Sequence, residues 1–211
     1  ILVDTAGLRR PSKRKEGVEI LSAFKSERAV AQADVVLLMV DIFTGPTDQD
    51  ARMVEYILEN HKAVILVANK MDVAQGSLAE PRKTFRAQVE KVFHFFPNIP
   101  VVFVSAKTGS GMKSLFDKVE DVWQQLHFRI STSQLNKFFY EVIRQAPAPV
   151  WGTQNVRFYY LTQTQQVPPS FIAFANHPQG VTPAYRRFLT KRIQKNWEIQ
   201  DVPIRLFVMR S

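Results

Sequence analysis

The sequence predicts an α/β protein, in which a doubly wound, mostly parallel sheet is followed by a small α+β domain. Short apolar runs at residues 35–40, 64–68 and 101–104 alternate with segments whose apolar residues recur at helical spacing. This is the pattern of parallel strands joined by helical crossovers. Polar residues begin directly after these runs, where open α/β sheets bind ligands. Near residues 127–130 the pattern changes to the order α-β-β-α-β.

Composition places the chain among ordinary globular proteins. It has 211 residues, 45% hydrophobic and 22% charged, enough for one large or two modest domains. No apolar run reaches the length of a membrane span, and there is no cysteine for a disulfide. We therefore expect a cytoplasmic monomer that makes no membrane contact. Four histidines are scattered without the spacing of metal ligands: His61, His94, His127 and His177.

The first domain is expected to span residues 1–128, with its sheet incomplete at the N-terminus. Helical spacing runs from near Val18 to about Ala33, and Thr47 with Asp50 forms a capping-box pattern before the next helix. Apolar stripes predict two further helices with packed faces. One stripe is Phe85, Val89, Val92, Phe93 and Phe96, and the other is Met112, Leu115, Phe116, Val119, Trp123 and Leu126.

The second domain is expected to span residues 129–211. Ser131 with Gln134 indicates a helix start, and the prolines in Ala146-Pro147-Ala148-Pro149 end that helix. Thr182-Pro183 reads as an N-cap followed by proline at the first helical position. The predicted strands are Val156–Gln163, Phe171–Asn176 and Ile204–Met209.

The residues after the second apolar run form the strongest motif. Asn69-Lys70-Met71-Asp72 has the form N-K-x-D, the guanine-specifying element of GTP-binding proteins. The ionised Asp72 can accept from the guanine N1–H and the exocyclic amine together, whereas adenine presents no such pair of donors. The stem of Lys70 can cover the base, and the Asn69 amide can tie the loop to its neighbours. A polar loop that spells N-K-x-D by chance is the alternative.

Two further elements in the right order weaken that alternative. Ser105-Ala106-Lys107 follows the third apolar run, 36 residues after Asn69, and S-A-K loops place a backbone N–H against the guanine O6. Upstream, Asp4-Thr5-Ala6-Gly7 has the D-x-x-G form that contacts the γ-phosphate and its Mg²⁺. Asp4 would reach Mg²⁺ through water, and the Gly7 N–H would face the γ-phosphate. We predict a guanine nucleotide site.

A segment that superficially looks like a phosphate-binding loop is rejected. Gly109-Ser110-Gly111-Met112-Lys113-Ser114 lacks a glycine immediately before the lysine, which G-x-x-x-x-G-K-[ST] requires. We expect these glycines to turn the chain into the last helix of the first domain. No such loop occurs elsewhere in the 211 residues, and the threonine-bearing switch I is also missing.

Positive charge is concentrated in the C-terminal part. The net charge is +9, of which residues 1–130 carry +2 and residues 131–211 carry +7. Such a bias favours a polyanionic partner, most simply RNA, with a merely solvated basic surface as the alternative. The candidate RNA-binding side chains recur every four residues: Arg187, Lys191 and Lys195.

Together these residues resemble the C-terminal half of the EngA (Der) family of bacterial GTPases, which carry two G domains and then a KH-like domain. The first domain contributes Asp4-Thr5-Ala6-Gly7-Leu8-Arg9-Arg10, Ala33-Asp34-Val35-Val36-Leu37-Leu38, Asn69-Lys70-Met71-Asp72 and Ser105-Ala106-Lys107-Thr108-Gly109. The more specific signatures lie in the second domain: Arg129-Ile130-Ser131-Thr132, Pro168-Pro169-Ser170-Phe171, Phe174-Ala175-Asn176, Tyr185-Arg186-Arg187-Phe188-Leu189 and Pro203-Ile204-Arg205-Leu206.

The resemblance implies a P-loop-GTPase-like domain and a KH-like domain that bind GTP or GDP with Mg²⁺. It implies GTPase activity in maturation of the large ribosomal subunit, with ribosomal RNA and an N-terminal G domain in cis as partners. Leu8 cannot orient the attacking water, so the catalytic residues stay unknown and K⁺ is a candidate source of extra charge. Without the phosphate loop, we expect little or no turnover from this chain. Two alternatives are a non-enzymatic ribosome-binding module and an intramolecular docking domain.

Overall fold

The computed structural model describes residues 29–73 and 78–211. The chain divides into two compact units, one ending at Val119 and the other beginning at Glu120. Of the helix expected between Val18 and Ala33, residues 29–32 are helical, and the earlier part lies outside the described residues. Within the described ranges no helix is long and apolar enough to cross a membrane.

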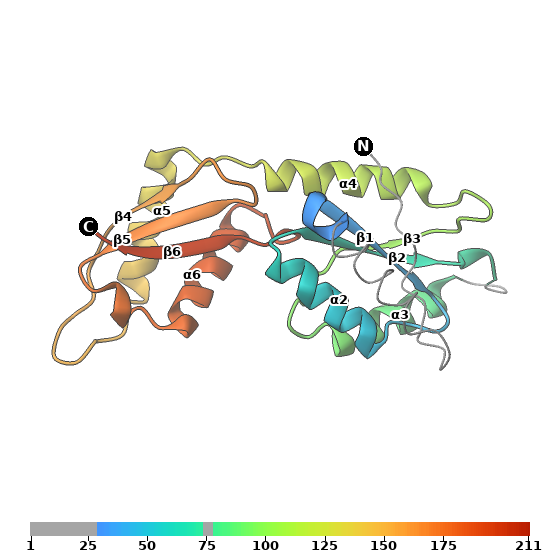
Figure 1. The fold of residues 1–211 in the computed structure, drawn as a ribbon, viewed down its shortest axis with the longest axis horizontal. Helices are drawn as coiled ribbons and strands as arrows, with labels where there is room; N and C mark the ends of the chain where they lie inside the picture. Colours follow the sequence, from blue (N-terminus) through green and yellow to red (C-terminus); the bar gives the residue numbers. More distant parts are fainter. Residues whose placement is uncertain (1–28, 74–77) are drawn as a thin grey trace. The chain divides into compact units, whose positions relative to one another are not determined.

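The described strands of the first unit form a parallel sheet, in agreement with the predicted mostly parallel one. Its strands are β1 (Val35–Asp41), β2 (Ala63–Asn69) and β3 (Val101–Phe103), in the order β1-β2-β3 (Figure 1). The register pairs Asp41 with Asn69, so β1 and β2 end side by side. β3 pairs with β2 up to Ala68 and leads into the next loop at the same edge.

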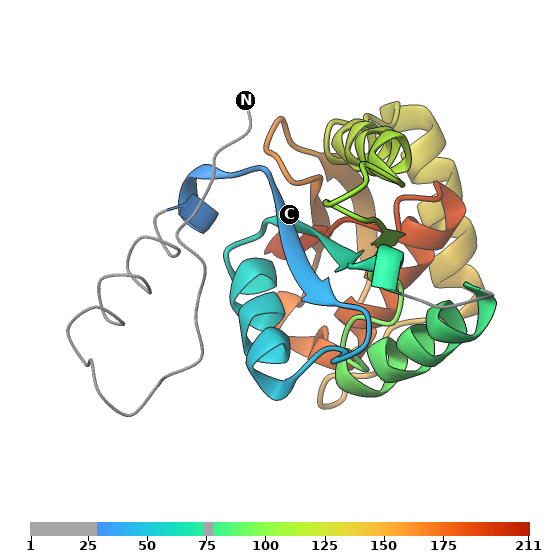
Figure 2. The same cartoon turned by 90° about the vertical axis from the view of Figure 1, so that its right-hand side faces the viewer.

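Helices cover both faces of this sheet. In both views α2 (Asp48–Glu59) and α3 (Ala79–Val92) lie on one face, and α4 (Met112–Leu126) lies on the other (Figures 1 and 2). The central strand is accordingly apolar on both sides, and every residue from Ala63 to Ala68 is at most 2% exposed. Such a strand reads as a continuous hydrophobic run because neither face meets water.

The start of α2 agrees with the prediction from its capping residues. α3 is shorter than its apolar stripe predicts. Thr47 caps α2, and Asp50 completes the capping box. α3 ends at Val92, so Phe93 and Phe96 lie beyond the helix, although Phe93 is fully buried. Pro97 disfavours helical backbone at the residue before it. Turns then carry the chain to Ile99.

The apolar stripe of α4 is narrower than expected. Leu115, Val122 and Leu126 are buried, but Phe116 is 61% exposed and Trp123 is 42% exposed. Each of these two aromatic residues follows a buried position by one residue, about 100° around the helix. The buried stripe therefore excludes both, and the expectation that they pack in the core is wrong. Trp123 lies against His127 instead, with ring centroids 4.0 Å apart.

The second unit has the predicted order α-β-β-α-β. Its helices are α5 (Thr132–Gln145) and α6 (Pro183–Asn196), capped by Ser131 and Thr182 as expected. A short 3-10 helix, η2 (Pro178–Gly180), precedes α6. The strands are β4 (Phe158–Gln163), β5 (Ser170–Ala175) and β6 (Arg205–Arg210). β4 pairs with β5 in the antiparallel direction. β6 pairs with β5 in the parallel direction, because α6 supplies the crossover between them.

The core of the second unit lies between the two helices and one face of this sheet. Phe139 of α5 and Tyr185 of α6 both contact the ring of Phe158, with centroid separations of 5.3 and 6.1 Å. Both helices and the sheet contribute core residues that are at most 2% exposed, and Val181, Ile199 and Val202 add to them from the connecting segments. Those of the helices and strands are Leu135, Phe139, Val142, Leu161, Phe171, Ala173, Ala175, Leu189 and Ile193. The other face of the sheet carries residues that remain accessible.

Candidate nucleotide site

Two loops of the first unit meet where β2 and β3 end. Val104 N–H donates to the carbonyl of Ala68 at 2.8 Å, and Met71 N–H donates to the carbonyl of Val104 at 3.2 Å. The backbone thus ties the loop after β2, which continues into η1 (Met71–Val73), to the chain that leaves β3. Side chains from both loops add to this connection.

Asn69 joins the loops through its side chain. Its Oδ1 accepts from the Lys70 N–H at 2.7 Å and from the Ala106 N–H at 2.9 Å. Residues 69 and 106 are far apart in sequence, so these bonds fix the Asn69-Lys70 loop against the Ser105-Ala106 loop. The Asn69 amide thus links its loop to a neighbouring one, as expected from the sequence.

Asp72 and Ser105 form a second link between the loops. Ser105 Oγ donates to Asp72 Oδ1 at 2.6 Å, and Ser105 itself is only 1% exposed. The same Oγ accepts from the Thr108 N–H at 3.2 Å. The hydroxyl bond from Ser105 lowers the pKa of Asp72, helped by the positive charges of Lys107 and Lys70. Asp72 is therefore an exposed carboxylate that stays ionised at neutral pH.

This carboxylate keeps capacity for a ligand. An ionised carboxylate offers about four lone-pair positions, and the Ser105 hydroxyl occupies one. Two parallel donors, such as the N1–H and amine of guanine, can still be accepted together. The bond from Ser105 also fixes the rotation of the side chain, so that less conformational entropy is lost when a ligand binds.

The N–H expected to face guanine O6 already has a partner. Ala106 N–H donates to Asn69 Oδ1, and Ala106 is exposed, so its small side chain leaves room for a ligand. A base whose O6 approaches this loop either shares the Ala106 N–H with Asn69 or takes the following N–H, that of Lys107. The lysine is also exposed.

Lys70 has a partner that the sequence analysis missed. Its Nζ lies 2.7 Å from Oδ2 of Asp41, the last residue of β1. The hydrogen bond from Lys70 lowers the pKa of Asp41, and that same bond raises the pKa of Lys70. Asp41 also accepts from the backbone N–H groups of Phe43 and Thr44. A polar residue at the end of the neighbouring parallel strand was the signal that could have identified Asp41.

Lys70 is held in an uncommon backbone conformation. Its φ of 72° lies in the left-handed region, which non-glycine residues rarely adopt. This conformation lets the chain turn sharply between Asn69 and η1, while the ammonium group reaches Asp41. The Lys70 side chain is 59% exposed, so its stem remains accessible to a flat ligand.

The glycines of the rejected phosphate-loop segment do turn the chain into α4. Gly109 and Gly111 have φ values of 76° and 80°. A Cβ at Gly111 would lie 2.2 Å from the carbonyl oxygen of Phe103, so the turn has no room for a side chain. Ser110 closes the loop, because its carbonyl accepts from the Ser105 N–H at 2.9 Å.

The remaining predicted site residues lie elsewhere. Asp4, Thr5, Ala6 and Gly7 are outside the described residues, and so is Leu8. Arg187, Lys191 and Lys195 are all exposed on α6.

Two neighbouring arginines of α6 are bound within the second unit. Arg186 donates to the carbonyls of Val181 and Pro178, and Arg192 donates to Gln145 Oε1. The basic surface of α6 therefore centres on Arg187, Lys191 and Lys195.

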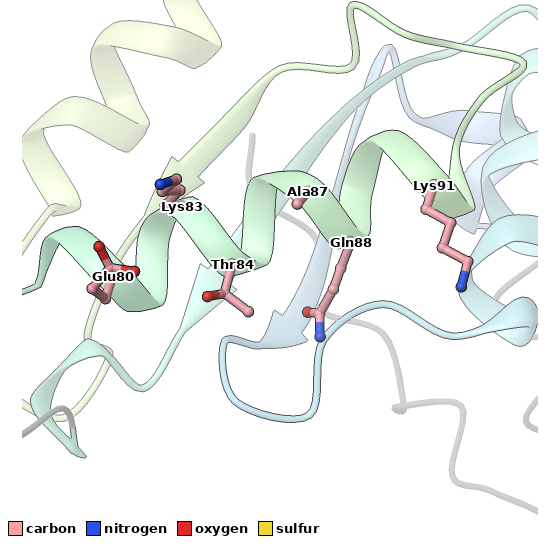
Figure 3. A pocket seen from close by; sticks show the side chains of 6 residues that line it. All are labelled: Glu80, Lys83, Thr84, Ala87, Gln88 and Lys91. Atoms are coloured by element: carbon pink, nitrogen blue, oxygen red, sulfur yellow. The ribbon is translucent and has the colours of Figure 1, made fainter.

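A surface hollow on α3 is not part of this site. Figure 3 shows the side chains that line it, all from α3, and the Gln88 amide reaches toward the loop that follows β1. The lining residues are Glu80, Lys83, Thr84, Ala87, Gln88 and Lys91. None belongs to the two loops at residues 69–72 and 105–107, which we call the base loops. Across residues 29–73 and 78–211, no group of three or more acidic or histidine side chains is placed to hold a metal ion.

Comparison with known families matches both units. Residues 129–209 match the family described as the KH-domain-like, C-terminal domain of EngA bacterial GTPase enzymes. Residues 23–125 match the elongation factor Tu GTP binding domain.

Curated relatives match nearly the whole chain. GTPase Der of Chloroflexus aggregans is 37% identical over 211 residues, which is 100% of this chain and 46% of that protein. GTPase Der of Geotalea daltonii is 36% identical over 209 residues, or 98% of this chain and 46% of that protein. GTPase Der of Caldanaerobacter subterraneus is 35% identical over 204 residues, or 97% and 46%.

The chain thus spans about half the length of the curated relatives it matches. Among solved structures, Aquifex aeolicus Era bound to GDP.AlF4- aligns with a TM-score of 0.48 and 17% identity, over 98% of this chain and 74% of that chain. That similarity is too low to support a functional inference.

Proposed function

The chain belongs to the EngA (Der) family, and on that premise we propose that it binds guanine nucleotides as part of a GTPase. The observation that carries this proposal is the pair of bonds between its two base loops. Asn69 fixes the Ala106 backbone, and Ser105 fixes the Asp72 carboxylate. These contacts build the edge that reads the base before any ligand enters.

In this proposal each side chain has a separate task. Asp72 accepts from the guanine N1–H and amine, and the Ala106–Lys107 backbone donates to O6. Lys70 covers the face of the base with its stem, while its ammonium stays with Asp41. Adenine presents an amine where guanine has O6 and lacks the N1–H, so both polar groups of the site would be left without partners. That mismatch gives specificity because a polar group that a ligand covers without pairing loses its hydrogen bonds to water.

Hydrolysis needs parts that the described residues do not supply. Asp4, Thr5, Ala6 and Gly7 are the proposed γ-phosphate and Mg²⁺ elements, with K⁺ as a further candidate cation. The 211 residues contain no G-x-x-x-x-G-K-[ST]. That loop supplies the amide cradle, a lysine and a metal ligand to the phosphates. We therefore propose that this chain by itself has little or no GTP turnover.

For the second unit we propose a role in maturation of the large ribosomal subunit, with ribosomal RNA as partner. What supports this is the family and the charge of residues 131–211, which is +7. An ordinary KH domain grips RNA through a GxxG loop. The only glycines in residues 131–211 are Gly152 and Gly180, so these residues contain no GxxG loop. Phosphates would instead meet the exposed side chains on α6, namely Arg187, Lys191 and Lys195.

The experiment that tests nucleotide binding is a titration of the 211-residue chain with GDP, GTP and ADP, followed by NMR shifts of the backbone amides. We expect GDP and GTP to move the amides of residues 69–72 and 105–107, and ADP to leave them unchanged. Equal responses to GDP and ADP would refute guanine recognition. A phosphate-release assay on the same sample tests turnover. A rate near that of a full-length Der protein would refute the proposal that this chain by itself has little or no GTP turnover.

A second experiment separates the proposed RNA partner from the alternative of an intramolecular docking domain. Filter binding of ribosomal RNA fragments is measured across a range of salt. Phosphate contacts give a steep fall of affinity with salt, since each contact releases condensed counterions. A chain that does not bind RNA at low salt would favour the docking domain. Retained RNA binding without any nucleotide response would favour the non-enzymatic module.

A further inference from the structure

The sheet of the second unit has two unlike faces. Leu161 and Ala173, paired in register on adjacent strands, are fully buried under the helices. Side chains alternate between faces along a strand, so their neighbours point to the opposite side. On that side Tyr160 is 41% exposed, Phe207 38% and Met209 50%. We call this side, with Thr162, Ile172, Phe174 and Arg205, the outer face.

The outer face is built from rows of flat and apolar side chains. The register places Tyr160, Phe174 and Met209 in one row across all three strands. The rings of Tyr160 and Phe174 are stacked, 4.5 Å apart with an interplanar angle of 22°. Thr162, Ile172 and Phe207 form the adjacent row. Two exposed aromatic rings therefore lie on rigid strands at neighbouring rows.

Charge on these strands has one sign. β4, β5 and β6 together contain no aspartate or glutamate, whereas β6 begins with Arg205 and ends with Arg210. The Arg205 guanidinium lies over the Phe207 ring, 4.9 Å from its centroid. Arg157 directly precedes β4. Arg210 pairs with the buried Ala175, so Arg205 is the arginine of β6 that lies on the outer face. An aromatic surface with Arg205 beside its exposed ring and no acidic residue on its strands matches a ligand that is flat, apolar and anionic.

We propose that the outer face is a stacking platform for unpaired bases of single-stranded RNA. The inference rests on the proposed RNA partner and adds to the α6 side chains a second contact surface, which binds bases rather than phosphates. Bases stack on the accessible rings of Tyr160 and Phe207, and Arg205 meets a flanking phosphate. Aromatic side chains on a sheet bind successive bases in this way because every base has a π-face. The platform lies across the sheet from the helices and needs no GxxG loop.

The test compares Phe207→Leu with Phe207→Tyr in the 211-residue chain. Leucine keeps an apolar side chain without a π-face, and tyrosine restores the ring. The probe is a 12-nucleotide oligouridine with a central 2-aminopurine, whose fluorescence falls when the base stacks. We expect the wild type and Phe207→Tyr to bind and quench alike, and Phe207→Leu to bind about tenfold more weakly with less quenching. Arg205→Gln should lower the slope of log affinity against log salt concentration by about 0.7, because one phosphate contact is lost.

Phe116→Leu is the matched control, because Phe116 is an exposed phenylalanine on α4 and should leave binding unchanged. RNA binding that is equal in the wild type, Phe207→Leu and Phe207→Tyr would overturn the platform while the proposed RNA partner stands. No binding of the oligouridine by the wild-type chain would overturn the platform, and no binding of ribosomal RNA fragments either would overturn both. Sedimentation velocity supplies a further outcome: self-association that Phe207→Leu abolishes would make the face an interface between copies and overturn the inference.

Discussion

The base loops of the first unit and the basic surface of α6 in the second unit represent two ways of preparing a binding site. Around Asp72 the chain has fixed each polar group through a partner: Ser105 for the carboxylate, Asn69 for the Ala106 backbone and Asp41 for Lys70. On α6, Arg187, Lys191 and Lys195 share an exposed surface and project into solvent. In the proposed function, the first arrangement selects its ligand by geometry, and the second attracts its ligand by charge.

The difference predicts different responses to change. A site whose atoms are positioned by hydrogen bonds loses its selectivity when one atom changes from acceptor to donor. A surface of solvated charges loses affinity gradually, in proportion to the charges removed, and depends strongly on salt. The predictions below test this contrast from the largest expected effect to the smallest.

The largest effect is expected from Asp72→Asn. The amide places a donor where the carboxylate accepts, and so opposes the amine of guanine. We expect GDP affinity to fall roughly 100-fold or more. Xanthosine diphosphate should gain relative to GDP, because xanthine has a carbonyl at that position. Calorimetric titration with both nucleotides measures the switch. Asp117→Asn on the exposed side of α4 is the matched control, and an equal loss there would contradict the assignment.

A smaller effect is expected when the three α6 side chains are replaced together by glutamine. If each meets one phosphate of a single strand, the slope of log affinity against log salt falls by about 2. Affinity at physiological salt should drop about tenfold, with no change in the midpoint of thermal unfolding. The control replaces Lys83, Lys91 and Lys113 of the first unit, which removes the same charge. Equal effects of the two triple variants would mean that the net charge of the chain attracts RNA and that α6 is not a specific contact.

Asn69→Ala tests whether the two base loops are held as one structure. It removes the acceptor for two N–H groups, at 2.7 and 2.9 Å. We expect the free energy of unfolding to fall by about 1–2 kcal/mol. In NMR spectra of the variant, the Ala106 amide should exchange faster with solvent. Asn196→Ala at the exposed end of α6 is the control. Unchanged exchange at Ala106 would show that the backbone bonds alone hold the loops.

Features set by local rules were predictable from the sequence, and features set by distant contacts were not. The capping box at Thr47, the proline start of α6 and the buried run at Ala63–Ala68 each follow from neighbouring residues. That the loops with the N-K-x-D and S-A-K motifs lie together was predictable, because both follow parallel strands that end at the same edge of the sheet.

The missed features depend on tertiary contacts. The Asp41–Lys70 pair joins the ends of two strands, so the polar residue after the apolar run of β1 marks Asp41 as a candidate, but the pairing itself depends on the strand order. Phe116 fits a helical stripe by spacing, yet its exposure depends on how wide a surface the sheet offers to α4. The partner of the Ala106 N–H was equally hidden, because the sequence gives residue types and not hydrogen-bond directions.

Ser105→Ala should give the smallest effect and the sharpest test of how the first site is prepared. The Ser105 hydroxyl is the main cause of the lowered pKa of Asp72, so its removal should raise that pKa toward its ordinary value. A lowered pKa keeps the carboxylate ionised as pH falls, and guanine affinity is lost only when pH passes through it. In Ser105→Ala that loss should therefore begin at higher pH, with affinity at pH 7 nearly unchanged. Side-chain carboxyl NMR of Asp72 measures the pKa directly, and GDP titrations from pH 7 to below pH 4 measure its consequence. An unshifted carboxyl titration would mean that Lys107 and Lys70, rather than the buried hydroxyl, keep Asp72 ionised, which would make this site more like the charged surface of α6 than its hydrogen bonds indicate.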